Sequence, residues 1–254
     1  MALATFAPPA PADDLGDVGA PAALARPSGA AVYAQHCAIC HGLEGRGDGE
    51  AAARFAVAPR DFTKSHYRFR STASGKLPTD DDLRRSIARG LGGTAMVPQD
   101  HLSEAELAAV IAFVKTLNPG FASEPAPKPM KLPVRSAKGA NSLERGRRIY
   151  GEAGCDNCHG DDGHGGGSSA GHLSLPPTDL TRHPLKGGSS AEDIVRAVVT
   201  GLNGTPMPSY HLLFDDRDFW DLAYYVESLG QPSETMTEQE RIGWEVEGRT
   251  PPQR

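Results

Sequence analysis

Cysteine and histidine recur in this chain at one fixed spacing, Cys-x-x-Cys-His. The two copies are Cys37-Ala38-Ile39-Cys40-His41 and Cys155-Asp156-Asn157-Cys158-His159. This spacing is the attachment signal for a c-type haem. Two intervening residues let one helical turn present both thiols to the vinyl groups of one haem edge, and the next residue reaches the iron as its proximal ligand. The pattern predicts two covalently attached haem c groups, with His41 and His159 as iron ligands.

Two other kinds of site also use paired cysteines. A redox-active dithiol does not require a histidine after the second cysteine, yet the histidine is present in both copies. A zinc site built from all four thiolates would bring the two pairs together, although a long stretch of sequence separates Cys40 from Cys155. The chain has 4 cysteines, so none remains for a structural disulfide.

Methionine can fill the second axial position of a haem iron, where it raises the reduction potential. The chain has 5 methionines, and three of them lie at the first residue, in a Pro-rich segment and near the end. The remaining two, Met96 and Met207, occupy equivalent places in Gly-rich loops before a helix. We expect these two to be the distal ligands. His101 and His211 are competing ligands, but they do not stand in register with each other.

The surroundings of the two motifs repeat, which indicates a tandem duplication. Pro59 to Thr63 matches Pro177 to Thr181 at an offset of 118, and Met96 matches Met207 at an offset of 111. The second copy has therefore lost residues between Thr63 and Thr79. Each copy predicts a helix before the motif, a helix in the middle and an amphipathic helix at the end. The expected starts and caps are Gly29, Thr79 and Ser103 in the first copy, and Gly146, Ser190 and Asp215 in the second.

Composition divides the chain into five segments. Residues 1–26 are an Ala- and Pro-rich extension, 27–118 and 143–230 are the two repeats, 119–142 is a Pro-rich linker, and 231–254 is a charged tail. Proline at this density favours an extended, semi-rigid linker. Trp244 in the tail is a candidate docking residue.

Other residues are candidates for supporting roles. The segments at Pro59 and Pro177 could offer carbonyl groups to the proximal histidines. Arg60, Arg68 and Arg70 could pair with haem propionates or form a solvated basic face. The unmatched histidines are expected at the surface: His36, His66, His164, His172 and His183.

Taken together, these residues resemble class I cytochrome c domains. The matching motifs are the two Cys-x-x-Cys-His-Gly stretches and the loops of Met96 and Met207, and they cover about residues 27–118 and 143–230. The chain looks like a di-haem, tandem class I cytochrome c of a bacterial periplasm. This resemblance implies an all-α fold of two small helical domains, in each of which the first and last helices cross around a haem. It also implies that the protein transfers electrons.

We therefore expect a soluble electron carrier, or the electron-transfer subunit of a larger oxidoreductase, with no catalysis of its own. The alternative is a di-haem enzyme, such as a peroxidase or a sulfur-compound oxidase, with one displaceable axial ligand. No run of the sequence could span a bilayer. Because covalent haem attachment normally takes place outside the cytoplasm, we expect a periplasmic protein made with an export signal.

Charge differs between the two repeats. Residues 27–118 hold 11 Lys and Arg against 10 Asp and Glu, whereas residues 143–230 hold 7 against 13. Such asymmetry can steer encounters with charged partners. The basic residues of the first repeat gather at Lys64, Arg68, Arg70 and Lys76. We expect redox proteins rather than nucleic acid as partners, and different proteins at each haem.

Overall fold

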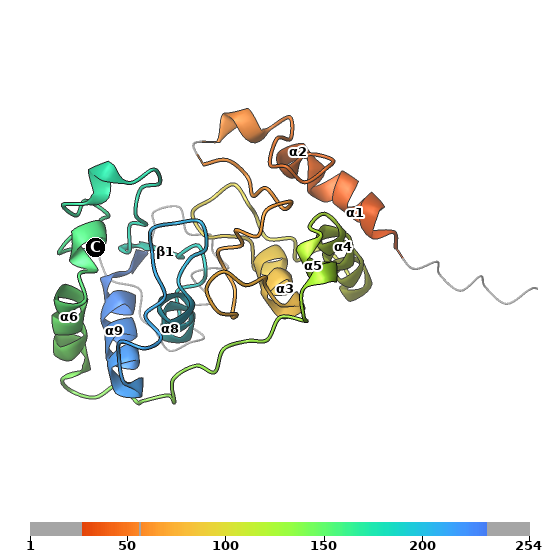
Figure 1. Ribbon diagram of the computed structural model, residues 1–254. Helices are drawn as coiled ribbons and strands as arrows, with labels where there is room; N and C mark the ends of the chain where they lie inside the picture. Colours follow the sequence, from red (N-terminus) through yellow and green to blue (C-terminus); the bar gives the residue numbers. More distant parts are fainter. Residues whose placement is uncertain (1–26, 56, 233–254) are drawn as a thin grey trace, which may run out of the picture.

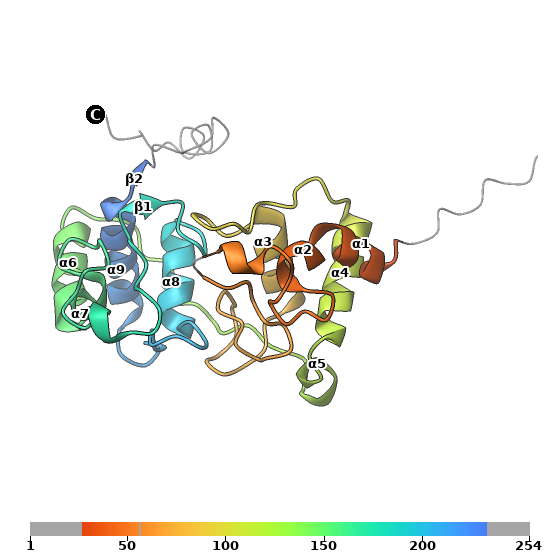
Figure 2. The same ribbon diagram turned by 90° about the horizontal axis from the view of Figure 1, so that it is seen from above.

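The computed structural model describes residues 27–55 and 57–232, which form two helical lobes side by side (Figures 1 and 2). Within these residues no helix combines the length and the apolar character that crossing a bilayer requires. The expected N-terminal extension, most of the charged tail and Trp244 lie outside the described residues.

The first lobe contains five helices and one 3₁₀ turn among the described residues. They are α1 (Gly29–His36), α2 (Ala38–His41), η1 (Ala52–Arg54), α3 (Asp80–Arg89), α4 (Glu104–Thr116) and α5 (Gly120–Ser123). The second lobe repeats this order with α6 (Ser142–Glu152), α7 (Asp156–His159), η2 (Ala170–His172), α8 (Ala191–Thr200) and α9 (Asp216–Leu229). Its two-residue strands β1 (Arg182–His183) and β2 (Gln231–Pro232) pair in parallel. The fold is all-α apart from this short pair.

Helix ends follow the sequence signals. The side chains of Thr79 and Ser103 cap α3 and α4 in complete capping boxes. Ser190 and Asp215 accept the equivalent bonds at the starts of α8 and α9. The middle helix of each lobe ends at a glycine with positive φ, 65° at Gly90 and 66° at Gly201.

The first and last helices of each lobe cross at a glycine. A Cβ atom on Gly29 of α1 would lie 2.1 Å from the carbonyl oxygen of Ala109 in α4. A Cβ atom on Gly146 of α6 would lie 2.1 Å from the carbonyl oxygen of Asp221 in α9. Only glycine lets the two backbones approach this closely. The expected crossing of terminal helices is therefore confirmed in both lobes.

Each lobe has its own apolar core. The first core joins α1, α3 and α4 through residues that include Val32, Tyr33, Leu83, Ile87, Val110 and Val114. The second core joins α6, α8 and α9 through residues that include Ile149, Tyr150, Ile194, Val195, Phe219 and Leu222. Because the two clusters share no residue, each lobe buries its helices independently.

The Pro-rich segment runs from α5 to α6 and contacts both lobes (Figure 1). On the first lobe, the Met130 N–H donates to the carbonyl of Ser71 at 2.8 Å. On the second lobe, the Trp220 Nε1–H donates to the carbonyl of Pro133 at 3.3 Å, and the Tyr224 hydroxyl donates to that of Ser136 at 2.7 Å. The segment is extended as expected from residue 125 onward, but residues 120–123 form the helical turn α5.

Two expectations about polar residues are wrong. His183 was expected at the surface, yet it is 1 % exposed. It lies in β1, which pairs with β2, and its ring packs against Gly230. Arg70 was expected to meet a propionate or solvent, yet it is 2 % exposed and its guanidinium donates to the carbonyl groups of Thr200 and Gly201 in the other lobe. The residues that contact His183 and Arg70 lie far from them in the sequence, so local patterns could not reveal these contacts.

Candidate haem sites

The two Cys-x-x-Cys-His motifs form matching single-turn helices, α2 and α7. In both, the first cysteine is the N-cap residue and the histidine ends the helix. The glycine that follows has positive φ, 77° at Gly42 and 79° at Gly160. A tyrosine from the preceding helix fixes each turn, because the hydroxyls of Tyr33 and Tyr150 donate to the carbonyls of these glycines at 2.8 Å.

Both motif histidines are oriented by a backbone carbonyl. Nδ1 of His41 lies 3.0 Å from the carbonyl oxygen of Arg60, and Nδ1 of His159 lies 2.9 Å from that of Thr178. A carbonyl oxygen only accepts, so Nδ1 carries the proton and Nε2 is left unprotonated, as a metal-binding imidazole requires. The expectation that the Pro59 and Pro177 segments supply these acceptors is confirmed, each acceptor being the residue after the proline.

Burial favours the neutral form of these imidazoles. It lowers the pKa of His41 and of His159, although the hydrogen bond to Arg60 or Thr178 acts in the opposite direction. His41 is 9 % exposed, and its ring stacks on Phe62 with ring centroids 4.4 Å apart. The second lobe has Leu180 in place of Phe62, so this stacking is specific to the first site.

The thiols do not have the properties of a redox dithiol or of a zinc site. Burial raises the pKa of Cys37 and of Cys155 to about 11, whereas a reactive dithiol depends on a lowered pKa. Among the described residues no group of three or more His, Cys, Asp or Glu side chains could hold a metal ion. The donor set in each lobe therefore fits covalent attachment of a haem better than either alternative.

The two methionine loops have the same hydrogen bonds. In the first, the Met96 carbonyl accepts from the Leu91 N–H at 2.8 Å, and the Met96 N–H donates to the hydroxyl of Thr94 at 3.1 Å. In the second, the corresponding bonds join Met207 to Leu202 at 3.1 Å and to Thr205 at 3.2 Å. Both methionines are partly buried. Duplication has therefore preserved the backbone geometry that presents each methionine.

The competing histidines lie on these loops but contact other groups. Nε2 of His101 lies 3.3 Å from Nδ1 of His36, and Nδ1 of His211 lies 3.1 Å from the hydroxyl of Ser209. These contacts differ between the lobes, whereas the methionine contacts are the same. The structure thus gives the methionines, and not the histidines, a common environment.

Two arginines of the first lobe are partly buried and could pair with a carboxylate ligand. Burial, with the neighbouring charge of Arg68, lowers the pKa of Arg60 to about 10, and burial lowers that of Arg68. Nε of Arg68 is buried without a hydrogen-bond partner among the described residues. A haem propionate would supply the missing acceptor. Arg70 does not belong to this set because it binds the second lobe.

Comparison with known proteins agrees with this geometry. The family described as Cytochrome c matches residues 28–118, and the family described as Cytochrome C oxidase, cbb3-type, subunit III matches residues 141–226. A chain of the Kuenenia stuttgartiensis reducing HAO-like protein complex Kustc0457/Kustc0458 has a similar solved structure. It is 39 % identical, with a TM-score of 0.75, over 80 % of this chain and 96 % of that chain. This chain is a tandem class I cytochrome c. No match was found among curated proteins.

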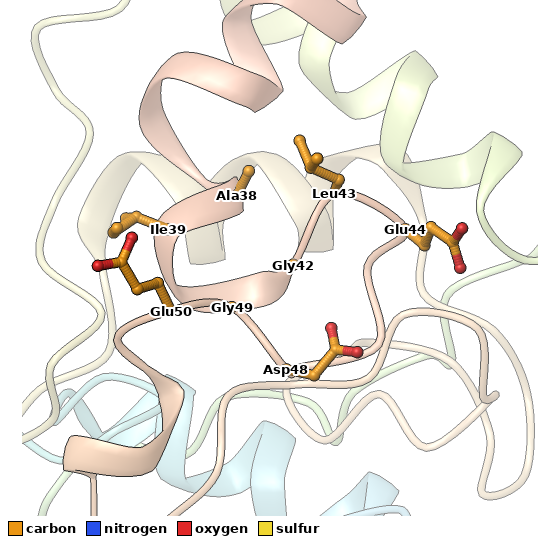
Figure 3. Close-up of a pocket in the computed structure, with 8 residues that line it drawn as sticks. All are labelled: Ala38, Ile39, Gly42, Leu43, Glu44, Asp48, Gly49 and Glu50. Carbon is orange, nitrogen blue, oxygen red and sulfur yellow. The ribbon is translucent and has the colours of Figure 1, made fainter.

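The cytochrome has an acidic pocket beside its first motif (Figure 3). Ala38 and Ile39 of α2 line it, with residues of the following loop that include the carboxylates of Glu44, Asp48 and Glu50. Neither Cys37 nor His41 lines the pocket. The pocket is therefore a surface feature beside the motif, separate from the side chains expected to hold the haem.

Sequence reasoning missed the role of two tyrosines in the cytochrome. Tyr33 and Tyr150 belong to the apolar cores, and their hydroxyls also donate to the carbonyl of the first glycine after each motif. The signal was present, because each tyrosine stands four residues after the glycine of its helix, Gly29 or Gly146. Phe62 left no comparable signal, since its counterpart is Leu180.

Proposed function

We propose that this cytochrome transfers electrons through two haem c groups. One would be attached to Cys37 and Cys40 and ligated by His41 and Met96. The other would be attached to Cys155 and Cys158 and ligated by His159 and Met207. The proposed haem-binding domains are residues 27–118 and 143–230, joined by the linker 119–142.

One observation carries this proposal: both lobes repeat the same hydrogen bonds on the histidine side and on the methionine side. Each proximal imidazole has Nδ1 bonded to a carbonyl nineteen residues later in the sequence. Each methionine loop is closed by a leucine N–H and a threonine hydroxyl. An enzyme would need one iron to be open and a polar group on its distal side. The repeated loops instead support two closed sites of the same kind.

The bound haem supplies the redox-active iron, and the chain tunes and holds it. The carbonyls of Arg60 and Thr178 hold the proton on Nδ1 of each histidine and strengthen its basicity as a ligand. Partly buried Arg60 and Arg68 would provide positive charge for propionates of the first haem. No residue of the chain needs to make or break a covalent bond during electron transfer, so we propose no catalytic residue.

We further propose that the cytochrome works as a subunit of a larger oxidoreductase in the periplasm. The solved relative belongs to a complex, and its chain is covered almost completely by this one. The simpler role, a free electron carrier, would use the same two haems. Isolation of the native complex from the source cell distinguishes a subunit from a carrier, since only a subunit copurifies with a second protein.

The ligand assignment is tested by Met96→Ala and Met207→Ala. Each variant should lose one of two Met–iron charge-transfer absorption bands and should lower one of two reduction potentials. His101→Ala and His211→Ala are the matched controls and should retain both bands. Reduced wild-type protein should bind carbon monoxide poorly. Fast binding of one equivalent of carbon monoxide would instead favour the di-haem enzyme with a displaceable ligand.

A further inference from the structure

A buried arginine of the first lobe caps a helix of the second. Arg70 is 2 % exposed, and its two terminal nitrogens donate to the carbonyls of Thr200 at 2.8 Å and Gly201 at 3.0 Å. These carbonyls end α8, where the helix dipole concentrates negative partial charge and favours a cation. In return the Thr200 hydroxyl lies 3.4 Å from the carbonyl of Arg70.

The next residues of the second lobe are held by the same segment of the first. Asn203 is 8 % exposed; its side-chain oxygen accepts from the Gly75 N–H at 2.9 Å, and its amide donates to the Lys76 carbonyl at 3.3 Å. At Gly204 a Cβ atom would lie 3.0 Å from Cβ of His66. Residues 200–204 are therefore fixed by residues 66–76, the part of the first lobe that is shortened in the second.

This fixed stretch begins the loop of Met207. Leu202 lies between Gly201, which Arg70 binds, and Asn203, and it donates its N–H to the carbonyl of Met207 at 3.1 Å. Thr205 accepts from the N–H of Met207 at 3.2 Å. A displacement of residues 200–203 would therefore move the methionine through the bond from Leu202 and through Thr205, whose hydroxyl donates to the Leu202 carbonyl at 2.8 Å.

The arrangement is not reciprocal. At the repeat offset of 111, Asn203 corresponds to Gly92, whereas Arg70 lies in the stretch that the second repeat has shortened and has no assigned counterpart. Gly92 does approach the second lobe, since its Cβ would lie 2.4 Å from the carbonyl oxygen of Pro184. Glycine, however, has no side chain with which to bind across the interface. Among the described residues, the loop of Met96 thus contacts the other lobe without a side-chain hydrogen bond, whereas the stretch that begins the loop of Met207 is bonded to the other lobe through the side chains of Arg70 and Asn203.

We propose that Arg70 and Asn203 are positioning residues for Met207, so that docking of the first domain holds the axial methionine of the second haem in place. This inference rests on the proposed His/Met ligation. It makes the ligation of the second haem depend on the contact between the domains, while the first haem is independent of it. Any partner that separates the domains would loosen Met207 and leave Met96 bound.

The test measures displacement of methionine by imidazole in the oxidised, haem-loaded protein. A Met96→Ala background leaves only the Met207–iron band, and a Met207→Ala background leaves only the Met96–iron band. Loss of the remaining band on adding imidazole then reports one site at a time. Arg70→Gln should raise the apparent imidazole affinity at the second haem about tenfold, because charge-assisted hydrogen bonds that hold the loop are lost. The first haem should not change.

Two more variants and one control complete the experiment. Asn203→Gly introduces the residue of the first repeat and should act in the same direction as Arg70→Gln. Arg70→Lys keeps the positive charge but lacks the planar guanidinium group. Its apparent imidazole affinity at the second haem should therefore lie between those of wild type and Arg70→Gln. Arg84→Gln removes a surface pair with Glu104 in the first lobe and should change neither haem.

The possible results are distinct. An unchanged imidazole affinity at the second haem in both Arg70→Gln and Asn203→Gly would overturn the inference, and so would an equal change at both haems. If Arg70→Gln fails to fold with haem, Asn203→Gly and Arg70→Lys decide. A Met96→Ala protein with no Met–iron band would refute the proposed ligation itself, before any interface residue is changed.

Discussion

Replacing Gly146 with alanine should destabilise the second lobe, although alanine is the better helix former. The new Cβ would lie 2.1 Å from the carbonyl oxygen of Asp221 and 2.6 Å from Cβ of Tyr225. Both contacts belong to α9 and one is backbone, so no side-chain rotation relieves the clash. The axes of α6 and α9 must separate by roughly 1 Å, which disrupts a close-packed interface.

The magnitude follows from two opposing terms. Alanine in place of glycine within a helix contributes about 0.5–1 kcal/mol of stability. Overpacking costs about 1–3 kcal/mol, and here the rigid backbone of α9 places the cost at the upper end. We expect Gly146→Ala to lower the free energy of unfolding of the second lobe by about 2 kcal/mol.

Gly151 provides a matched control in the same helix. A Cβ on Gly151 would meet no atom within 4 Å, so Gly151→Ala gains helix propensity without a clash and should stabilise by about 0.5 kcal/mol. Urea unfolding followed by far-ultraviolet circular dichroism measures both variants. The reasoning is refuted if the two substitutions shift stability in the same direction.

Two further substitutions test polar contacts of α9. Asp221 is 0 % exposed, and although burial opposes its charge, the hydrogen bond from Arg145 Nε at 2.6 Å holds its pKa below the usual value. The stabilisation is therefore present above the unfolded pKa of about 3.9 and lost as the pH falls through the folded value. Asp221→Asn should lower the free energy of unfolding by about 2 kcal/mol at pH 7. In urea titrations this difference from wild type should shrink below about pH 4. A difference that stays constant with pH would contradict the reasoning. Tyr224→Phe removes the hydroxyl that donates to Ser136 and should cost about 1 kcal/mol, with faster proteolysis of the linker. Unchanged cleavage would show that this bond does not hold the linker.

Local signals predicted most of the helical framework. Thr79 with Asp82 and Ser103 with Glu106 form capping boxes that depend only on residues three positions apart. Gly29 and Gly146 stood at equivalent places before the motifs, and both mark a helix crossing. The acceptors of the proximal histidines also lay in the expected segments, because duplication preserved them at a constant spacing.

The contacts between lobes could not be predicted in the same way. Arg70 is bonded to carbonyls about 130 residues later in the sequence, and a carbonyl carries no side-chain signature. The burial of Arg70 removes one member of the basic cluster Lys64, Arg68, Arg70 and Lys76, while the side chains of Lys64 and Lys76 stay 66 % and 64 % exposed. Arg70 is buried between the lobes, and Lys64 pairs with Asp61 at 2.9 Å. The bonds of Trp220 and Tyr224 to the linker likewise end on backbone oxygens.

The mass of the intact, denatured protein tests the central claim most directly. Thioether bonds survive unfolding, so each Cys-x-x-Cys-His motif should keep its haem when the fold is lost. We predict a single species with the mass of the chain plus two haems, and peptides carrying one haem each at Cys37–Cys40 and at Cys155–Cys158. A chain with one haem, or haem that acid acetone extracts, would contradict the account.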